Sequence, residues 1–369
     1  MKEINLASVL AERRREKGIT QDELADFAGV SKSSVSKWET GHSFPDITIL
    51  PVLASYFDIS VDELICYKPQ LSKEEIGRVY KRMADRFAKD SFEDVLEECE
   101  SLTKKYYSCY PFLLEIAGLY INHAAMADGR ENQMNIYALA SKICKRILDN
   151  SKEGRVIAQA QTLQAICYTI QGKAKEVLEL LGDEVELRMM PGIQIAHAHL
   201  MLGDSAKADE AMQADLYQSV MGAFGTTLTY MQKNITDFDF ASEAFRRAEG
   251  ICELFNMKAL NANNMALLYA AGAYMNVLAG KNQDALGMLE KYVDVCCDNF
   301  FPYKIHGDEF FNQLEDWLEK RSSFMPRSES VVKESMLKDV LMSQTFEGLR
   351  AYPEFERLAD RLKALIGGE

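Results

Sequence analysis

The chain has 369 residues, of which 47% are hydrophobic and 27% are charged, so it can bury more than one core and is neither disordered nor collagen-like. Its formal net charge of -14 argues against a surface that coats nucleic acid or anionic membrane indiscriminately, so any DNA contact must be local. No segment resembles a signal-peptide core or a membrane span. With eight scattered cysteines read as reduced thiols, we expect a cytoplasmic protein of at least two structural units.

Apolar residues recur at three- and four-residue spacing along almost the whole chain, a pattern typical of helices. Strands flanked by hairpin turns are not indicated, so the expected fold class is all-α. Up to about Ile65 the predicted helices are short, and beyond this point they lengthen. Because Pro69 breaks any continuing helix, we place a linker at 67–71, between a domain of residues 1–66 and one of residues 72–369.

Strong helix-end signals stand in the first domain. Thr20, followed three residues later by Glu23, predicts a capping box at the start of a second helix. Gly29 predicts a tight turn, and Ser31 predicts the cap of a third helix. This pattern indicates two short helices joined by a short turn.

The third helix has a clear inner side and a clear end. Val35 and Trp38 are one turn apart and face the core, while Gly41 and Pro45 end the helix. Together with the capping signals, these residues resemble the helix-turn-helix domain of the Xre/Cro family of repressors, from roughly Ile4 to Ile65. The resemblance implies a five-helix lambda-repressor-like domain whose third helix enters the major groove of double-stranded DNA.

The resemblance also assigns individual DNA contacts. Gln21 matches the family's phosphate-contacting glutamine, and Lys32, Ser33 and Lys37 match base-reading positions. The two lysines favour a guanine-containing half-site because lysine can donate to guanine. Arg14 and Glu39 match an ion pair that braces the first helix against the third. The expected DNA-binding residues are Gln21, Ser31, Lys32, Ser33, Ser34, Ser36, Lys37, Thr40 and His42.

The charge of this domain leaves a second interpretation open. Residues 1–69 carry eight Lys/Arg and eleven Asp/Glu, a net charge of -3, whereas DNA affinity normally comes from cationic side chains. Residues 29–44 nevertheless hold Lys32 and Lys37 against Glu39 alone, so the reading face can be positive. The alternative is a helix-turn-helix retained for binding protein.

Three segments of the second domain consist of a helix, a small turn and another helix. Their turn glycines, Gly172, Gly203 and Gly280, are 31 and 77 residues apart, close to one and two periods of the roughly 34-residue tetratricopeptide repeat. We therefore expect a tetratricopeptide-like array of about six hairpins. An Xre-type domain followed by such an array resembles the Rgg, PlcR and NprR group of peptide-pheromone regulators in low-GC Gram-positive bacteria. This resemblance implies a homodimer that senses a short peptide in quorum sensing.

In that group, asparagines on inner helices hold the main chain of the peptide. The candidates here are Asn261 and Asn264, three residues apart, and a second set of Thr226, Tyr230 and Lys233, in which Lys233 could take a peptide carboxylate. The same polar residues could equally cap helices, bond to neighbouring helices or face water. By contrast, we expect the tyrosine-rich and methionine-rich stripes to form core, as at Leu113, Ile116 and Tyr120.

Enzyme signatures are missing from the sequence. It contains no GxxxxGK[ST] phosphate loop, no HExxH and no GxSxG, so we expect no catalytic residue and no cofactor. His197 and His199 are two residues apart and point to different helix faces, so no metal site is expected. Cys296 and Cys297 are interpreted as packing residues.

These patterns favour a sequence-specific transcriptional regulator that binds a palindromic operator as a homodimer and senses a peptide or protein ligand through its array. The alternative is a scaffold or regulator that acts through protein contacts of the array, with the DNA-binding domain secondary.

Overall fold

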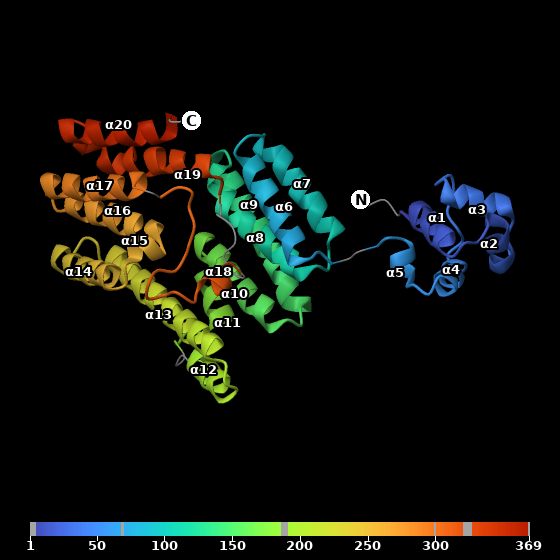
Figure 1. The fold of residues 1–369 in the computed structure, drawn as a ribbon. Helices are drawn as coiled ribbons and strands as arrows, with labels where there is room; N and C mark the ends of the chain where they lie inside the picture. Colours follow the sequence, from blue (N-terminus) through green and yellow to red (C-terminus); the bar gives the residue numbers. More distant parts are fainter. Residues whose placement is uncertain (1–4, 68–69, 186–190, 299, 320–326, 368–369) are drawn as a thin grey trace. The chain divides into compact units, whose positions relative to one another are not determined.

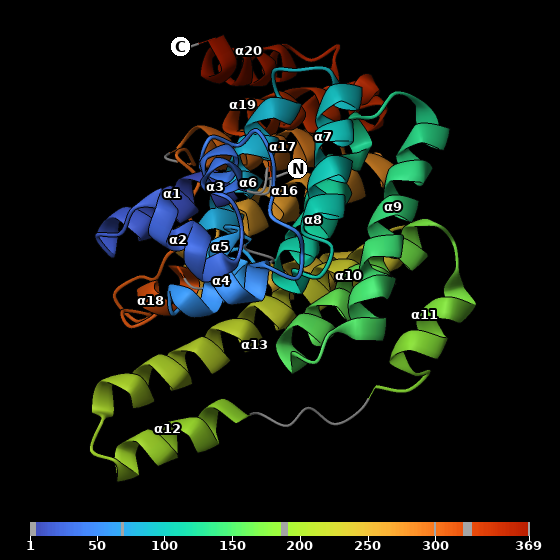
Figure 2. The same cartoon turned by 90° about the vertical axis from the view of Figure 1, so that its right-hand side faces the viewer.

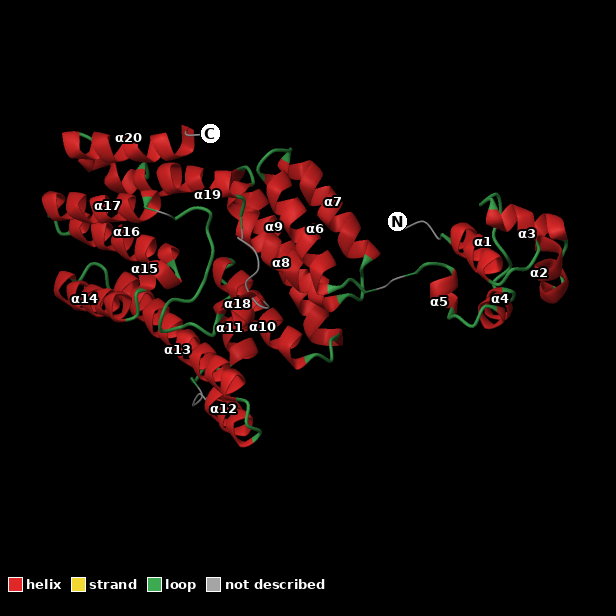
Figure 3. Cartoon of the chain, viewed as in Figure 1, coloured by secondary structure: helices red, strands yellow, loops and turns green. Residues whose placement is uncertain are grey.

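The computed structural model describes residues 5–67, 70–185, 191–298, 300–319 and 327–367. Every regular element in these ranges is a helix (Figure 3), which confirms the all-α fold class. The chain divides into two compact units, Met1–Met83 with Asp90–Leu181 and Ala84–Lys89 with Gly182–Glu369. The predicted linker at 67–71 includes Lys68 and Pro69, which lie outside the described residues, so this boundary stays a prediction.

Residues 5–67, called the head below, hold five short helices (Figure 1): α1 (Leu6–Glu16), α2 (Gln21–Ala28), α3 (Lys32–Glu39), α4 (Leu50–Tyr56) and α5 (Val61–Leu64). They surround a core of their own, to which each helix gives a fully buried side chain: Leu10, Leu24, Val35, Leu53 and Leu64. Helices of this length are marginal alone in water, so the shared core is what stabilises them.

Six further helices follow the head, all in the first unit except the end of α6 after Met83: α6 (Lys73–Phe87), α7 (Phe92–Lys105), α8 (Tyr110–His123), α9 (Gly129–Asn150), α10 (Gly154–Ile170) and α11 (Ala174–Leu181). Most of α8 is buried, and α7, α9 and α10 pack against it. Leu113, Ile116 and Tyr120 are each at most 1% exposed, which confirms that they are core residues.

In the second unit, α12 (Pro191–Met201) packs beside the long α13 (Ser205–Lys233), as Figure 2 shows. The helices that follow are α14 (Phe238–Leu254), α15 (Met257–Leu260), α16 (Ala262–Leu278), α17 (Asn282–Cys297), α18 (Glu315–Glu319), α19 (Glu329–Ser335) and α20 (Pro353–Gly367). The centre of this unit is α16, whose Gly272 lies against the ring of Phe245 from α14. A glycine at this position lets the two helices approach closely.

All three turn glycines have the backbone conformation expected from the sequence. The φ angles of Gly172, Gly203 and Gly280 are +71°, +79° and +71°, and each residue ends the first helix of a pair. The amide that follows each glycine bonds back to the helix, as when Lys281 N donates to the carbonyl of Asn276 at 2.9 Å. The helix pairs α10/α11, α12/α13 and α16/α17 are therefore correctly predicted, while their assignment to tetratricopeptide repeats stays a prediction.

All eight cysteines are free thiols. Cys296 is buried, which agrees with its interpretation as a packing residue, and burial raises its pKa to about 12. Within the described ranges, no helix has the length and apolar composition needed to cross a bilayer.

Candidate nucleic-acid interface

The helix-turn-helix of the head is set by local hydrogen bonds. The hydroxyl of Thr20 accepts from the amide of Glu23 at 3.2 Å, and the Glu23 carboxylate accepts from the amide of Thr20 at 2.7 Å, so the predicted capping box is present. Gly29 has a φ of +68° and ends α2 in the left-handed region, and the Ser31 hydroxyl accepts from Ser34 N to start α3. These residues fix the direction in which α3 leaves the turn.

One side of α3 is buried and the other faces outward. Val35 and Trp38 are 0% and 5% exposed and pack in the core of the head. Lys32, Ser33 and Lys37 are exposed. The side chains assigned to base reading therefore lie where another molecule can reach them.

A polar network ties the end of α3 to α1 and α2. Arg14 donates from Nε to Glu39 Oε1 at 2.5 Å and from Nη2 to Oε2 at 3.0 Å, which confirms the ion pair expected from the resemblance. Gln21 donates to the same Oε2 at 2.9 Å. Burial alone would raise the pKa of Glu39, but the hydrogen bonds from Arg14 and Gln21 outweigh it and hold the pKa below its ordinary value of 4.5.

Gln21 is thus half-buried and braces α2 against α3. The amide group of Gln21 has a second N–H, which is available to a phosphate. The phosphate contact stays a prediction.

Lys32 has a partner that sequence reasoning missed. Its Nζ lies 2.6 Å from Oδ2 of Asp22 on α2, and both side chains are 60% exposed. An exposed pair of this kind contributes about 0 to 1 kcal/mol, so DNA can displace Asp22 at small cost. The pair depends on the packing of α2 against α3, which no local sequence signal reports.

The predicted hydroxyl contacts form a small cluster at the start of α3. Ser31 Oγ lies 2.8 Å from Ser33 Oγ and 2.9 Å from Ser34 Oγ. Ser34 and Ser36 are half-buried, and Ser31 and Ser33 are exposed. Because a hydroxyl can accept as well as donate, this cluster can still bond to a ligand at its open side.

The segment after α3 carries two further predicted contacts. Thr40 donates its hydroxyl to the carbonyl of Ser36 at 2.8 Å, and His42 Nδ1 lies 2.8 Å from that hydroxyl, with both residues exposed. Sequence reasoning overlooked Phe44 and Ile47, which are 58% and 77% exposed in the same connection. The sequence signal that could have identified them is the presence of two large apolar residues in a short polar loop.

Both candidate asparagines of the second unit contact other residues of the chain through their side chains. Asn261 precedes α16 as its N-cap residue rather than lying within the helix, and its Oδ1 accepts from the Tyr303 hydroxyl at 3.1 Å. Asn264 is half-buried, with Nδ2 3.4 Å from the sulfur of Met221 and 3.6 Å from that of Met257. Sulfur is a weak acceptor, so the Asn264 amide remains able to form stronger hydrogen bonds.

The other candidate set lies on the exposed side of α13. Thr226, Tyr230 and Lys233 are all exposed, and the ring of Tyr230 packs edge-on against Phe240 at 4.9 Å. Met221, which contacts Asn264, lies on the opposite side of the same helix, packed against the core. The structure therefore places the two sets on different faces and does not bring them together as one site.

No group of three or more His, Cys, Asp or Glu side chains within the described residues is placed to hold a metal ion.

Comparisons with known proteins concern the head. The family model described as helix-turn-helix matches residues 10–64. The chain is 36% identical over 56 residues to the HTH-type transcriptional activator BcrR of Enterococcus faecalis, an alignment that covers 15% of this chain and 28% of that protein. No solved structure matches the chain significantly. The amino-terminal part of this chain is therefore a helix-turn-helix domain of the type found in transcriptional regulators.

Proposed function

We propose that the chain is a sequence-specific DNA-binding regulator of transcription and that α3 is its reading helix. The observation that carries this proposal is the outward side of α3, where Lys32 and Lys37 are exposed while Glu39, the acidic residue of this helix, is neutralised by Arg14. Lys32, once Asp22 is displaced, and Lys37 therefore give positive charge to the side of α3 that enters the major groove in helix-turn-helix proteins. The likeness to a transcriptional activator supports the same function.

The test measures binding of the full chain to DNA selected from a random pool, with Lys32→Ala and Lys37→Ala as variants. A lost base contact costs about 1 to 3 kcal/mol on the selected sequence, whereas a lost phosphate contact weakens all sequences alike. Arg13→Ala is the control, because it removes the same charge from the head at a residue that pairs with Glu16 within α1. Unchanged affinity in both lysine variants contradicts the assignment.

We also propose that the protein acts as a homodimer on a palindromic operator. One helix-turn-helix reads a short half-site, and two on a two-fold axis read half-sites about one helical turn, or roughly 34 Å, apart. Exposed apolar side chains near the end of α12 support association between chains, because Met201 and Leu202 are 89% and 81% exposed. A protein that sediments as a monomer at micromolar concentration, with and without DNA, refutes this part.

Peptide sensing by the second unit is the third part of the proposal. A peptide that regulates DNA binding must change operator affinity, typically by a factor of about 5 to 150. Asn264→Ala is expected to lower the affinity for a peptide fraction from the host's medium, measured by calorimetry, and to leave DNA affinity without peptide intact. Lys233→Ala tests the separate face of α13. If no peptide fraction binds and DNA selection also fails, the scaffold alternative is favoured.

A further inference from the structure

A groove of about 470 Å³ lies in the first unit, and all of its lining residues lie outside the head. Lys104 of α7 lines one side, Lys142 of α9 lines the other, and Tyr120 is the lining residue that α8 contributes. Its volume is within the range of pockets that bind small molecules. We call it the α7/α9 groove.

The net charge of the residues that line this groove is opposite in sign to the net charge of the whole chain. The cationic residues that line it are Lys104, Lys142, Lys145 and Arg146, and the carboxylates are Glu100 and Asp149. The lining therefore carries a net charge of +2, while the whole chain carries -14. Within the described part of the chain, none of the four cations has an ion-pair partner. Like charges three and four residues apart on α9 repel one another, so an anion placed between them is stabilised.

The guanidinium of Arg146 is already oriented. Its Cζ lies over the Tyr107 ring, 4.0 Å from the ring centre, a cation–π contact that favours this position of the guanidinium. Its buried Nε has no hydrogen-bond acceptor among the described residues. A guanidinium with an unused donor is well suited to a phosphate or a carboxylate, which accept two parallel hydrogen bonds.

Tyr120 supplies an independent observation. Its side chain is 1% exposed, yet its hydroxyl has no hydrogen-bond partner in the described structure. Burial raises the pKa of Tyr120, so the hydroxyl keeps its proton and is a donor. Most buried polar groups in folded proteins are hydrogen-bonded, and an exception on a residue that lines a cationic groove points to a missing acceptor.

We propose that the α7/α9 groove binds a small anionic molecule through a phosphate or carboxylate group. The anion accepts hydrogen bonds from Arg146 and Tyr120 and is neutralised by the lysines of α7 and α9. This site is independent of the proposed DNA contacts, which belong to the head.

Isothermal calorimetry on the full chain tests the proposal, with pyrophosphate, citrate and a short peptide prepared both with a free carboxylate and as its amide. At least one of the anions is expected to bind, and binding weakens as salt is added. Preference for pyrophosphate identifies a phosphate ligand, and a preference for the free peptide over its amide identifies a peptide carboxylate. If none of these anions binds at millimolar concentration, the proposal is wrong.

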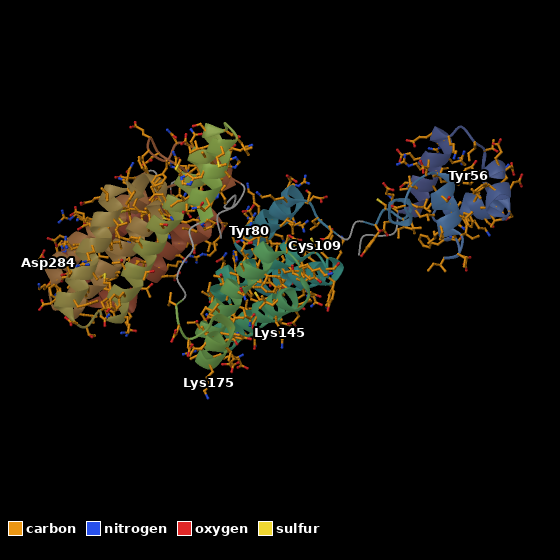
Figure 4. All side chains as sticks on the ribbon, turned by 90° about the horizontal axis from the view of Figure 1, so that it is seen from below. Tyr56, Tyr80, Cys109, Lys145, Lys175 and Asp284 are labelled. Atoms are coloured by element: carbon orange, nitrogen blue, oxygen red, sulfur yellow. The ribbon has the colours of Figure 1, made fainter. Side chains whose placement is uncertain are left out.

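Tyr120→Phe removes only the hydroxyl and is expected to lower anion affinity about fivefold while leaving the thermal midpoint unchanged or higher, because no internal hydrogen bond is lost. A lower midpoint with unchanged affinity shows that the hydroxyl serves the fold, and this result contradicts the proposal. Lys145→Gln is expected to weaken binding, whereas Lys175→Gln on α11 is the matched control, because Lys175 is exposed and does not line the groove. Figure 4 labels both lysines. Equal losses in both lysine variants indicate unspecific attraction and refute the site.

Discussion

The Arg14–Glu39 pair offers the sharpest test of how the head is held together. The Arg14 and Glu39 side chains are only 14% and 6% exposed, so the pair is screened less than a surface pair. Glu39 accepts three hydrogen bonds, two from Arg14 and one from Gln21. Removal of either partner leaves the other charge in a partly buried place, and we expect Arg14→Ala and Glu39→Ala each to cost about 2 to 4 kcal/mol.

The double variant Arg14→Ala/Glu39→Ala isolates the interaction energy of the pair from the other effects of each substitution. Once both charges are gone, no unpaired charge remains, so the double variant should cost less than the sum of the single variants by about 2 kcal/mol. The cycle also cancels the bond that Arg14 donates to the carbonyl of Ile19 at 2.8 Å, because this bond is lost in every variant without Arg14.

Urea unfolding monitored by tryptophan fluorescence gives the measurement. The chain has two tryptophans, Trp38 in the head and Trp317 on α18. In a Trp317→Phe background, the fluorescence reports on Trp38, which is 5% exposed and adjacent to Glu39. Single-variant costs that add within about 0.5 kcal/mol would refute the coupling.

The pH dependence of the unfolding free energy gives a second test of the Arg14–Glu39 pair. Because the folded pKa of Glu39 lies below its ordinary value of 4.5, the carboxylate contributes stability above that value and loses it as the pH falls through the folded pKa. Glu39→Gln should remove this part of the acid dependence. The difference in unfolding free energy between wild type and Glu39→Gln should therefore shrink from neutral pH to below pH 4.5, and a constant difference would contradict the assigned cause.

Two further predictions concern packing and cysteine chemistry. Gly272→Ala should destabilise the second unit by about 1 to 3 kcal/mol, because the added methyl group lies 2.5 Å from Phe245 Cε2. By contrast, the methyl group added by Gly225→Ala on α13 meets no atom within 4 Å. This variant should stabilise the second unit by about 0.5 to 1 kcal/mol in the same thermal melt. Equal midpoints for these two variants would rule out the close packing described. Labelling of the native protein with Ellman's reagent should show a fast phase from the exposed Cys66, absent in Cys66→Ser, while Cys144, whose pKa burial raises to about 12, reacts only on unfolding.

The parts of the fold that could be predicted depend on contacts within a few residues. The Thr20 capping box, the left-handed Gly29 and the turn glycine Gly172 each follow from residues next to them in sequence, and all three are as expected. Core positions such as Val35 follow from helical spacing. The Arg14–Glu39 pair spans 25 residues, and it came from the resemblance to a known family.

The candidate effector site shows why polar residues on helices are hard to interpret from sequence. Spacing alone places Asn261 and Asn264 on one helix face, yet Asn261 precedes the helix and bonds to Tyr303, 42 residues away. Asn264 contacts Met221, 43 residues away in the opposite direction. The partner of a polar side chain is decided by tertiary packing, which periodicity does not report.

Net charge is equally uninformative about individual sites, because it sums over surfaces that packing keeps apart. Residues 1–69, which include the head, have a net charge of -3, but Arg14 neutralises Glu39 and leaves Lys37 facing outward on α3. The α7/α9 groove shows the same separation of charge, since Lys142 and Lys145 of α9 line it together with Tyr120 in a strongly acidic chain. The energy of an anion in this groove depends mainly on the charges that line it, because charges more than about 10 Å away are largely screened at ordinary salt concentration.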